Sequence, residues 1–512
     1  MEISSVPSVT IQSLSDYNDK EIQLNGWVQN MRQGKGLAFI IVRDGSGFCQ
    51  CVASEQALGQ AEFSKTNNLT LESSLTVKGK VVKDERQIGG YELQITGIEV
   101  HQVAKDYPIS KKAHGVDFLL DKRHLWLRSK RQWAIMRVRN QVIFSIHEFF
   151  QKNGFVQMDA PIFTGNACEG TTDLFETEFF DQPAYLSQSG QLYGEAMAMA
   201  MGKIYTFGPT FRAEKSKTRR HLSEFWMIEP EMAYYTLEMT LDVIENFLQS
   251  IITNVLEKCE LELEVLERDT TSLKNALKSF VRLSYKDAVA ILKGEKDVDG
   301  KYSIQLLEDD LAKAKSRLDQ VLAEATNLEA QIKKGGIKKG KLARMDAAVQ
   351  KLKAEQKELE ESIRNIPTWI ESAKNFEDGA DFGGSDETVI TRMFSTPVMV
   401  YNWPKAIKAF YMKEVDGEPS LVKGVDVLAP EGYGEIVGGG ERETDIDVLV
   451  DSINKHELPM SEFEWYLDLR RYGSVPHAGF GLGLERFITW ICKIHHLREA
   501  IPFPRLMGRL LP

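Results

Sequence analysis

Two runs of apolar residues near the middle of the chain constrain its fold more than any other feature. In each run the apolar positions lie alternately three and four residues apart, with one step of seven in the second run, which is the spacing of a helix with one apolar seam. The first run consists of Ile304, Leu307, Leu311, Ala314, Leu318, Val321, Ala325, Leu328 and Ile332. The second consists of Leu342, Met345, Val349, Leu352, Leu359, Ile363 and Ile366. Because the glycine-containing segment KKGGIKKGK lies between them, the two helices are predicted to form an antiparallel coiled-coil hairpin.

This hairpin is predicted to be an insertion at residues 297–367, since glycines precede it and Pro367 follows it. Its tip concentrates positive charge at Lys333, Lys334, Lys338, Lys339 and Lys341, with Lys351 nearby. Two roles fit this pattern equally well. The hairpin is either a solvated spacer or dimer contact, or an arm whose lysines contact RNA phosphates.

The first hundred residues show a different periodicity. Five segments between residues 20 and 102 alternate apolar and polar side chains, as short strands do, and turn signals separate them. They predict a small barrel of the OB-fold type, a fold that binds single strands by stacking bases on aromatic side chains. We expect this domain at residues 1–105 and a hinge at residues 106–128. Spacing alone favours a core position for Phe39 and a solvated one for Gln50.

The rest of the chain, residues 129–512, mixes helical and strand patterns and predicts an α+β catalytic domain that contains the hairpin.

The net charge of −11 disfavours indiscriminate nucleic-acid binding but leaves open a local basic surface for one RNA. No apolar run approaches the length of a membrane span, and the N-terminal residues lack the pattern of a signal peptide. The five scattered cysteines contain no CxxC pair and indicate reduced thiols in a cytoplasmic protein.

The segment GPTFRAEKSKTRRHLSEFWMIEPEMA contains the strongest candidate for a nucleotide site. Two alternating runs flank a basic loop, which predicts two antiparallel strands. Arg212 ends the first strand, where an arginine can clamp a phosphate through two hydrogen bonds. Glu214 points to the same side and can accept from an amino group, and Phe225 can stack on a purine. Because Arg220 and His221 lie in the loop, they can reach more distal phosphates.

Two further segments add groups of the same kind. In HAGFGLGLERFITW a strand of small residues runs directly into a helix, so the backbone can approach a ligand closely and Arg486 enters from the helix start. In VKGVDVLAPEGYGEIVGGGERE, Asp426 and Glu435 lie in alternating strands. Carboxylates opposite an arginine-rich site suit Mg²⁺ bridged to phosphate oxygens.

These motifs resemble those of class II aminoacyl-tRNA synthetases. FRAE…RRHLSEF and GLGLERF are similar to the second and third signature motifs, and residues 131–161 to the first, which forms the dimer interface. The barrel-first order and segments such as TFGPTFRAE, IKAFYMK and DVLAP resemble the aspartate/asparagine/lysine subgroup, and within it the asparaginyl enzymes. The hairpin and the tail after Arg505 depart from the family pattern. The resemblance implies an antiparallel-sheet catalytic domain with flanking helices, a homodimer, and ATP-dependent ligation of L-asparagine to tRNA(Asn) through an asparaginyl-adenylate.

The resemblance also implies roles for individual residues. ATP would contact Arg212, Glu214, Arg220, His221, Phe225 and Arg486, with Arg212 and Arg486 as the catalytic arginines. Asp426 and Glu435 match the carboxylates that bind Mg²⁺ with ATP. Asparagine would contact Glu169, Ser189, Gln191, Glu195 and Arg442, with Glu169 on its α-ammonium group. The anticodon would contact Arg32, Phe39 and Gln50, which reverses the preference for Phe39 in the core.

The choice between asparagine and aspartate depends on the segment QSGQLYGE. Aspartate enzymes resemble this chain but carry a lysine where Gly194 stands, and that lysine neutralises the substrate carboxylate. We predict that Glu195 accepts from the amide NH₂ of asparagine while Arg442 donates to the amide oxygen. An aspartate carboxylate would then be rejected by like-charge repulsion.

Three other functions fit parts of the pattern. An aspartyl-tRNA synthetase of relaxed specificity would require the lysine that is missing at Gly194. An amidotransferring asparagine synthetase related to this catalytic domain would lack the barrel. A non-catalytic tRNA-binding paralogue is expected to have lost Arg212, Glu435 or Arg486, and all three are present.

Overall fold

The computed structural model describes residues 6–87, 89–110, 112, 114–165, 174–215, 218 and 220–512. The chain forms two compact units, Met1–Trp133 and Ala134–Leu511, which divide just beyond the segment that was expected to be a hinge. Each unit has a hydrophobic core of its own. Within the described residues, no helix is both long and apolar enough to cross a membrane.

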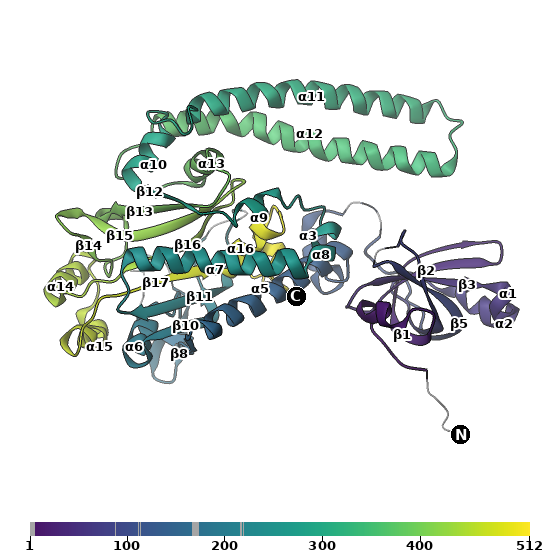
Figure 1. The fold of residues 1–512 in the computed structure, drawn as a ribbon, viewed down its shortest axis with the longest axis horizontal. Helices are drawn as coiled ribbons and strands as arrows, with labels where there is room; N and C mark the ends of the chain where they lie inside the picture. The colour runs from purple at the N-terminus through teal and green to yellow at the C-terminus, as the bar shows by residue number, and fades with distance from the viewer. Residues whose placement is uncertain are drawn as a thin grey trace. The chain divides into compact units, whose positions relative to one another are not determined.

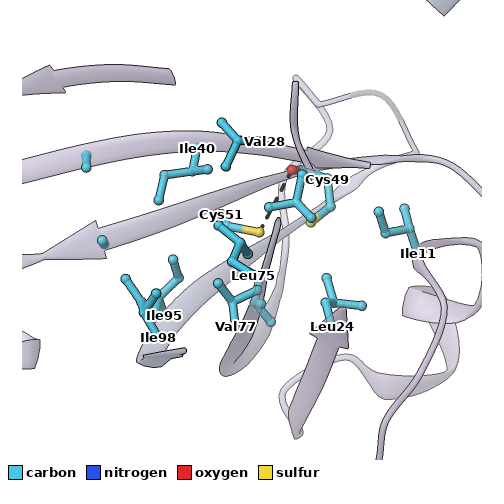
Figure 2. Packing of buried hydrophobic residues seen from close by; sticks show 14 of the residues in the cluster. Ile11, Leu24, Val28, Ile40, Cys49, Cys51, Leu75, Val77, Ile95 and Ile98 are labelled. Carbon is cyan, nitrogen blue, oxygen red and sulfur yellow. Dashed lines mark hydrogen bonds between the residues drawn. The ribbon is translucent and has the colours of Figure 1, made fainter. Parts of the chain in front are cut away.

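The first unit contains a closed barrel of five strands in the order β1-β2-β3-β5-β4. These strands are β1 (Glu21–Gly34), β2 (Leu37–Arg43), β3 (Phe48–Ser54), β4 (Ser74–Lys83) and β5 (Tyr91–Gln102). Alternate residues face inward, so that Val28, Ile40, Cys51 and Val77 fill the interior (Figure 2). The predicted OB-type barrel is therefore confirmed.

Two glycines allow the barrel strands to approach one another closely. A Cβ atom at Gly26 would lie 2.4 Å from the carbonyl oxygen of Arg43, and one at Gly79 would lie 2.3 Å from that of Gln94. Both distances are far below van der Waals contact. A side chain at either position would therefore force neighbouring backbone apart.

The first unit also contains short helices. They are η1 (Ile11–Tyr17), α1 (Glu55–Leu58), α2 (Gln60–Phe63), η2 (Ser64–Asn68), α3 (Val116–Asp121) and α4 (Arg123–Trp126). Trp133, near the end of the first unit, packs on the barrel, and its indole N–H donates to the carbonyl oxygen of Gly45 at 2.7 Å. Its ring also packs edge-on against Phe48, with 4.8 Å between the centroids.

The second unit is built on a sheet that has nine strands among the described residues, in the order β12-β13-β15-β16-β17-β11-β10-β6 with β14 beside β15. The strands are β6 (Val156–Gln157), β10 (Lys203–Phe211), β11 (Glu224–Ala233), β12 (Val281–Ser284), β13 (Val398–Pro404), β14 (Glu414–Val415), β15 (Glu418–Ala429), β16 (Gly434–Glu441) and β17 (His477–Gly483). Pairing is antiparallel from β13 to β10 and parallel only at the edges, between β10 and β6 and between β12 and β13. The predicted antiparallel catalytic sheet is confirmed.

Helices flank this sheet. They are α5 (Lys130–Lys152), α6 (Gln191–Met201), α7 (Leu237–Lys258), α8 (Glu260–Val265), α9 (Thr271–Asn275), α10 (Tyr285–Leu292), α13 (Gly384–Arg392), α14 (Ile446–Lys455), α15 (Met460–Arg471) and α16 (Leu484–Ile491). Helix α7 runs along the strands (Figure 1) and buries apolar residues that recur at three- and four-residue intervals, such as Ile244, Leu248 and Ile251. A small sheet of β7 (Phe163–Thr164), β9 (Gln182–Leu186) and β8 (Glu176–Phe179) precedes α6. Short 3₁₀ helices η3 (Lys405–Ile407) and η4 (Leu497–Glu499) complete the unit.

The hairpin consists of α11 (Ser303–Lys333) and α12 (Lys339–Lys374), which lie side by side (Figure 1). Seam residues Ala314, Val321 and Ala325 of α11 are buried, as the spacing predicts. Ion pairs link the two helices: Arg317 bonds to Glu355 at 2.7 Å and Lys353 to Glu329 at 2.8 Å.

Helix α12 does not end at Pro367, where the insertion was expected to end, but continues to Lys374. A proline inside a helix removes one backbone hydrogen bond and costs roughly 3 kcal/mol. The turn beyond it buries Ala373 completely and packs Trp369 and Ile370 against the core of the second unit. This apolar burial outweighs the lost hydrogen bond, since one large apolar side chain alone contributes about 1.5–3 kcal/mol.

Candidate active site

A cavity of about 550 Å³ opens on the second unit, over β11, β16, β17 and the segment around residues 406–412. Its lining divides into an arginine-rich part and a part with carboxylates and one arginine. The first contains Arg212, Arg220, His221, Phe225 and Arg486, and the second Ser189, Gln191, Glu229, Glu231 and Arg442. Most of the residues predicted for the site therefore meet in one cavity, although they come from segments far apart in the sequence.

Glycines of β16 and β17 contribute backbone to the cavity lining. A Cβ atom at Gly439 would lie 2.5 Å from the carbonyl oxygen of Gly479, and one at Gly440 would lie 2.5 Å from that of Lys423. Glycines on β16 and β17 therefore let neighbouring strands close up without side chains between them. Gly438 and Gly481 line the cavity itself.

Strands β10 and β11 hold the first group of predicted residues. Their register pairs Phe211 with Glu224, so the two ends of the connecting loop lie together. The guanidinium of Arg212 lies over the ring of Phe225, 5.5 Å from its centroid. A flat base could rest against this aromatic ring while the arginine faces its phosphates. The predicted antiparallel pair and its basic loop are confirmed.

The loop cations are held from several sides. Arg220 donates to the carbonyl oxygen of Gly432 at 2.6 Å and to Glu387 at 3.3 Å. The imidazole of His221 lies 3.8 Å from the carboxylate of Glu214. Burial, together with the cation of Arg486, lowers the pKa of His221. Glu214 lies in a recess that adjoins the main cavity and is also lined by Arg212 and His221.

Asp426 and Glu435 lie beside each other over Gly438. A Cβ atom at Gly438 would be 2.8 Å from Oε1 of Glu435 and 3.6 Å from Oδ1 of Asp426. Their other oxygens are engaged, because Lys408 donates to Asp426 at 2.6 Å and Arg486 to Glu435 at 3.2 Å. Burial raises the pKa of Asp426 to about 7.

This pair of oxygen donors fits Mg²⁺ better than a metal that requires an all-protein shell. Within the described residues, no group of three or more His, Cys, Asp or Glu side chains could enclose an ion. Mg²⁺ commonly takes one or two carboxylates and completes its shell with phosphate oxygens and water. The carboxylate oxygens of Asp426 and Glu435 match this coordination preference.

Ser189 and Gln191 reach the cavity from the start of α6. The Ser189 hydroxyl and the Gly190 N–H both donate to Glu229, the latter at 2.8 Å. Arg442 donates to Oε1 of Glu231 at 2.5 Å, and both side chains are almost completely buried. Burial raises the pKa of Glu231 to about 7, against the effect of Arg442.

Glu195 does not occupy the predicted position. Its side chain is fully buried and does not line the cavity, so the prediction that it bonds to a ligand amide does not fit the structure. Four side chains donate to its carboxylate: Gln191 at 3.1 Å, Tyr466 at 2.8 Å, Arg470 at 2.9 Å and His477 at 2.9 Å. Although burial opposes ionisation, Arg470 and His477 hold the pKa of Glu195 below its usual value.

The position of Gly194 has a related explanation. A Cβ atom there would lie 3.2 Å from Cγ of Glu231, so the space beside this glycine is taken by the carboxylate that pairs with Arg442. A lysine at this position would displace Glu231. Glycine at position 194 therefore goes together with the buried ion pair between Glu231 and Arg442.

Three predicted anticodon residues lie on the barrel surface. Arg32 and Phe39 are paired across β1 and β2, with the guanidinium 5.8 Å from the ring centroid. Phe39 is half-buried between the inward residues Ala38 and Ile40, so spacing alone was wrong to favour it for the core. Gln50 donates to Glu92 at 3.1 Å. Glu169, predicted for the α-ammonium group, lies outside the described residues.

Sequence reasoning missed two carboxylates that line the cavity and a third, Glu387, that bonds to the cavity residue Arg220. Glu229 and Glu231 are two residues apart on β11, which places them on one face of the strand, and this spacing was a usable signal. Glu387 on α13 had no such signal, because only the fold brings it to Arg220. Burial and the nearby Glu435 raise the pKa of Glu387 to about 7.

Comparisons with known proteins agree with this geometry. The family described as tRNA synthetases class II (D, K and N) matches residues 115–507, and the OB-fold nucleic acid binding domain matches residues 22–100. The asparagine–tRNA ligase of Pelotomaculum thermopropionicum is 44% identical over 504 residues, covering 98% of this chain and 99% of that protein. That of Sorangium cellulosum is 45% identical over 507 residues, covering 99% of both.

A solved structure is also similar over the whole chain. The crystal structure of asparaginyl-tRNA synthetase from Pyrococcus horikoshii, complexed with asparaginyl-adenylate, superposes with a TM-score of 0.79 at 36% identity. The match covers 99% of this chain and all of that one. With a barrel, an antiparallel catalytic sheet and an arginine-lined cavity in place, the chain belongs to the class II tRNA synthetases of the D, K and N group.

Proposed function

We propose that the protein ligates L-asparagine to tRNA(Asn) in two steps, through an asparaginyl-adenylate, with AMP and diphosphate as the other products. One observation carries the proposal: a single cavity joins an arginine-rich part to a buried part that contains Arg442, Glu229 and Glu231. The first part suits the phosphates of ATP and the second suits a neutral amide. Full-length relatives named asparagine–tRNA ligase support the same reading.

The arginine-rich part would bind ATP. Arg212 lies over the ring of Phe225, against which the adenine would stack, and can hold the α-phosphate. Arg486, which lines the same cavity and bonds to Glu435, can hold a further phosphate oxygen. Arg220 and His221 would meet the more distal phosphates, and Glu214 would accept from the adenine amino group. Asp426 and Glu435 would hold Mg²⁺, which neutralises charge on the phosphates when bound.

The second part explains selection of asparagine over aspartate. Arg442 is already paired with Glu231, so its charge is balanced inside the cavity. An amide adds no charge: its oxygen can accept from Arg442, and its NH₂ can donate to Glu229, which takes the role first assigned to Glu195. An aspartate carboxylate would bring an unbalanced negative charge beside two carboxylates, which is strongly penalised in a buried site.

In the first step an oxygen of the asparagine carboxylate attacks the α-phosphorus of ATP and diphosphate leaves. In the second, a terminal hydroxyl of the tRNA attacks the activated carbonyl carbon and AMP leaves. No enzyme nucleophile is required. The protein contributes positioning and neutralisation of the charge that develops on the phosphate, through Arg212 and Arg486. Ser189, Gln191 and Glu169 would orient the amino acid.

The rest of the molecule supplies the remaining partners. Arg32, Phe39 and Gln50 share the outer face of the barrel, where an anticodon base could stack and bond. Exposed apolar side chains in and just after the first motif, namely Phe144, Val156, Ile162 and Phe163, fit a homodimer interface. The four described cysteines are free and buried, in keeping with a cytoplasmic enzyme.

Exchange of labelled diphosphate into ATP, measured with asparagine and with aspartate side by side, tests the proposal. We expect exchange with asparagine and at least a hundredfold less with aspartate, since a difference of about 2.7 kcal/mol is readily supplied by an unpaired buried charge. Arg442→Gln removes the donor to the amide oxygen and should abolish most of the exchange with asparagine, while Arg471→Gln, on the exposed face of α15, should leave it intact. Exchange with aspartate alone would overturn the substrate assignment.

A further inference from the structure

The hairpin takes no part in the reaction described above, because none of its residues lines the cavity. Its charges are nevertheless sorted along its length. Residues 333–344 contain six basic residues and no acidic one. Residues 303–332 contain six acidic and three basic residues, and residues 345–374 contain six acidic and five basic. The hairpin therefore has an acidic stem and a basic tip, in a chain whose net charge is −11.

Some cations of the stem have ion-pair partners, whereas the four tip lysines whose side chains the structure describes have none. Arg317 bonds to Glu355, Lys353 to Glu329, and Arg392 of α13 to Asp310 of α11. Among the side chains that the structure describes, Lys333, Lys334, Lys338 and Lys341 are exposed and have no ion-pair partner. Like charges this close repel one another, so the tip carries an electrostatic cost that a bound polyanion would remove.

The tip is also held at a defined reach. Leu307 and Ile366, at the base of the two helices, are buried in the same cluster as Tyr285 and Trp403 of the catalytic unit. Helix α11, which begins four residues before Leu307, is 31 residues long, or about 46 Å at the rise of an α-helix. Because the stem is anchored at its base, it holds the charges of the tip at a defined distance from the catalytic unit, which a flexible basic tail would not do.

The composition of the tip selects the kind of partner. It has no aromatic side chain, so it cannot bind unpaired bases by stacking. Gly335 and Gly336, both with positive φ, lie in the turn, and the sequence between residues 333 and 344 contains only Ile337, Leu342 and Ala343 as apolar residues besides glycine. A contact between copies of the chain would need a larger apolar centre. Lysines on a bare turn suit the phosphate backbone of a folded RNA, contacted without reading its sequence.

We infer that the hairpin tip binds backbone phosphates of the tRNA substrate, through Lys333, Lys334, Lys338 and Lys341. The identity of the RNA rests on the proposed function. The contact strengthens tRNA binding and leaves amino-acid activation unchanged, because it lies outside the cavity.

The test replaces these four lysines by glutamine, which keeps the helix-forming tendency of the chain. At about 0.15 M salt the KM for tRNA should rise roughly tenfold, and the slope of log affinity against log salt should become shallower by about 2–4. Diphosphate exchange with asparagine should not change. The matched control replaces four exposed stem lysines by glutamine, namely Lys313, Lys315, Lys357 and Lys374, and should leave both KM and the salt slope unaltered.

Three results would overturn the inference. The tip variant could keep the KM and salt slope of the parent. The control could lose as much affinity as the tip variant, in which case only net charge matters. The tip variant could change the sedimentation coefficient of the free protein while charging tRNA normally, which would make the tip a contact between copies. If the parent protein showed no diphosphate exchange at all, the proposed function would fail. The role of the tip would still be decided by measuring the binding of tRNA to the tip variant and to the control variant in a filter-binding assay.

Discussion

The carboxylate of Glu195 lies between Arg470 and His477, and all three side chains are buried. Replacing Glu195 by glutamine keeps the shape but leaves the Arg470 cation without its counter-charge. Removing one partner of a buried pair typically costs about 3–5 kcal/mol, so the unfolding midpoint in urea should fall markedly. Glu464→Gln, which breaks the exposed pair with Arg471, should change the midpoint little. Equal midpoints for the two variants would contradict the buried-pair account.

Glu231 makes selectivity dependent on pH. Its pKa is raised to about 7, so above this pH the carboxylate is ionised and balances Arg442. Below it Glu231 binds a proton, and Arg442 becomes an unbalanced cation that favours a carboxylate ligand. The ratio of exchange rates with asparagine and aspartate should therefore fall as the pH is lowered from about 8 to about 6. In folded Glu231→Gln protein the ratio should be low and flat across this range; a flat, high ratio in the parent would contradict the assignment.

The sequence predicted the cations of the candidate site better than its carboxylates. Arg212, His221 and Phe225 lie in one local motif, so their proximity follows from the strand pair alone. Choosing between Glu195 and Glu229 required knowing where Arg470 and His477 lie, and these residues come more than 270 positions after Glu195. A buried carboxylate can be structural or can bind a ligand. The hydrogen-bond donors around it decide between these roles, and they are known only from the fold.

Among the elements, the barrel depends on glycines where strands approach most closely. Gly79→Ala would place a methyl group 2.3 Å from a backbone oxygen, and an overpacked core position typically costs about 1–3 kcal/mol. We expect a lower melting temperature for the barrel and weaker tRNA charging, with diphosphate exchange retained because the cavity belongs to the other unit. Gly97→Ala is the matched control, since its Cβ would meet only the Cβ of Lys78, at 4.0 Å. Similar melting for both variants would contradict this.

Sequence patterns predicted the barrel strands and the hairpin helices and missed one helix end. Alternation located the five barrel strands, and the seam spacing located both hairpin helices. Pro367 suggested a helix end, because local sequence does not show that Ile370 and Ala373 will find a core to pack against. Tertiary burial decided the boundary there.

For the molecule as a whole, the proposed homodimer is the property most open to test. Phe144 on α5 is 57% exposed, within the segment that resembles the first motif. Phe144→Glu would place a charge in an apolar interface, so the protein should sediment as a monomer and lose most of its exchange activity. Tyr234→Glu, at a residue that is 72% exposed elsewhere on the unit, should remain a dimer. A parent protein that sediments as a monomer at micromolar concentration would refute the proposal.

The glycines of β16 and β17 have a consequence for any attempt to retool the pocket. Gly439 and Gly440 leave no room for even one methyl group, since the neighbouring backbone oxygens would lie 2.5 Å away. A mutant library that diversified this strand would return glycine at both positions. New amino-acid selectivity is therefore better sought by changing side chains that line the cavity, such as Gln191, Glu229 and Arg442, than by changing these two glycines.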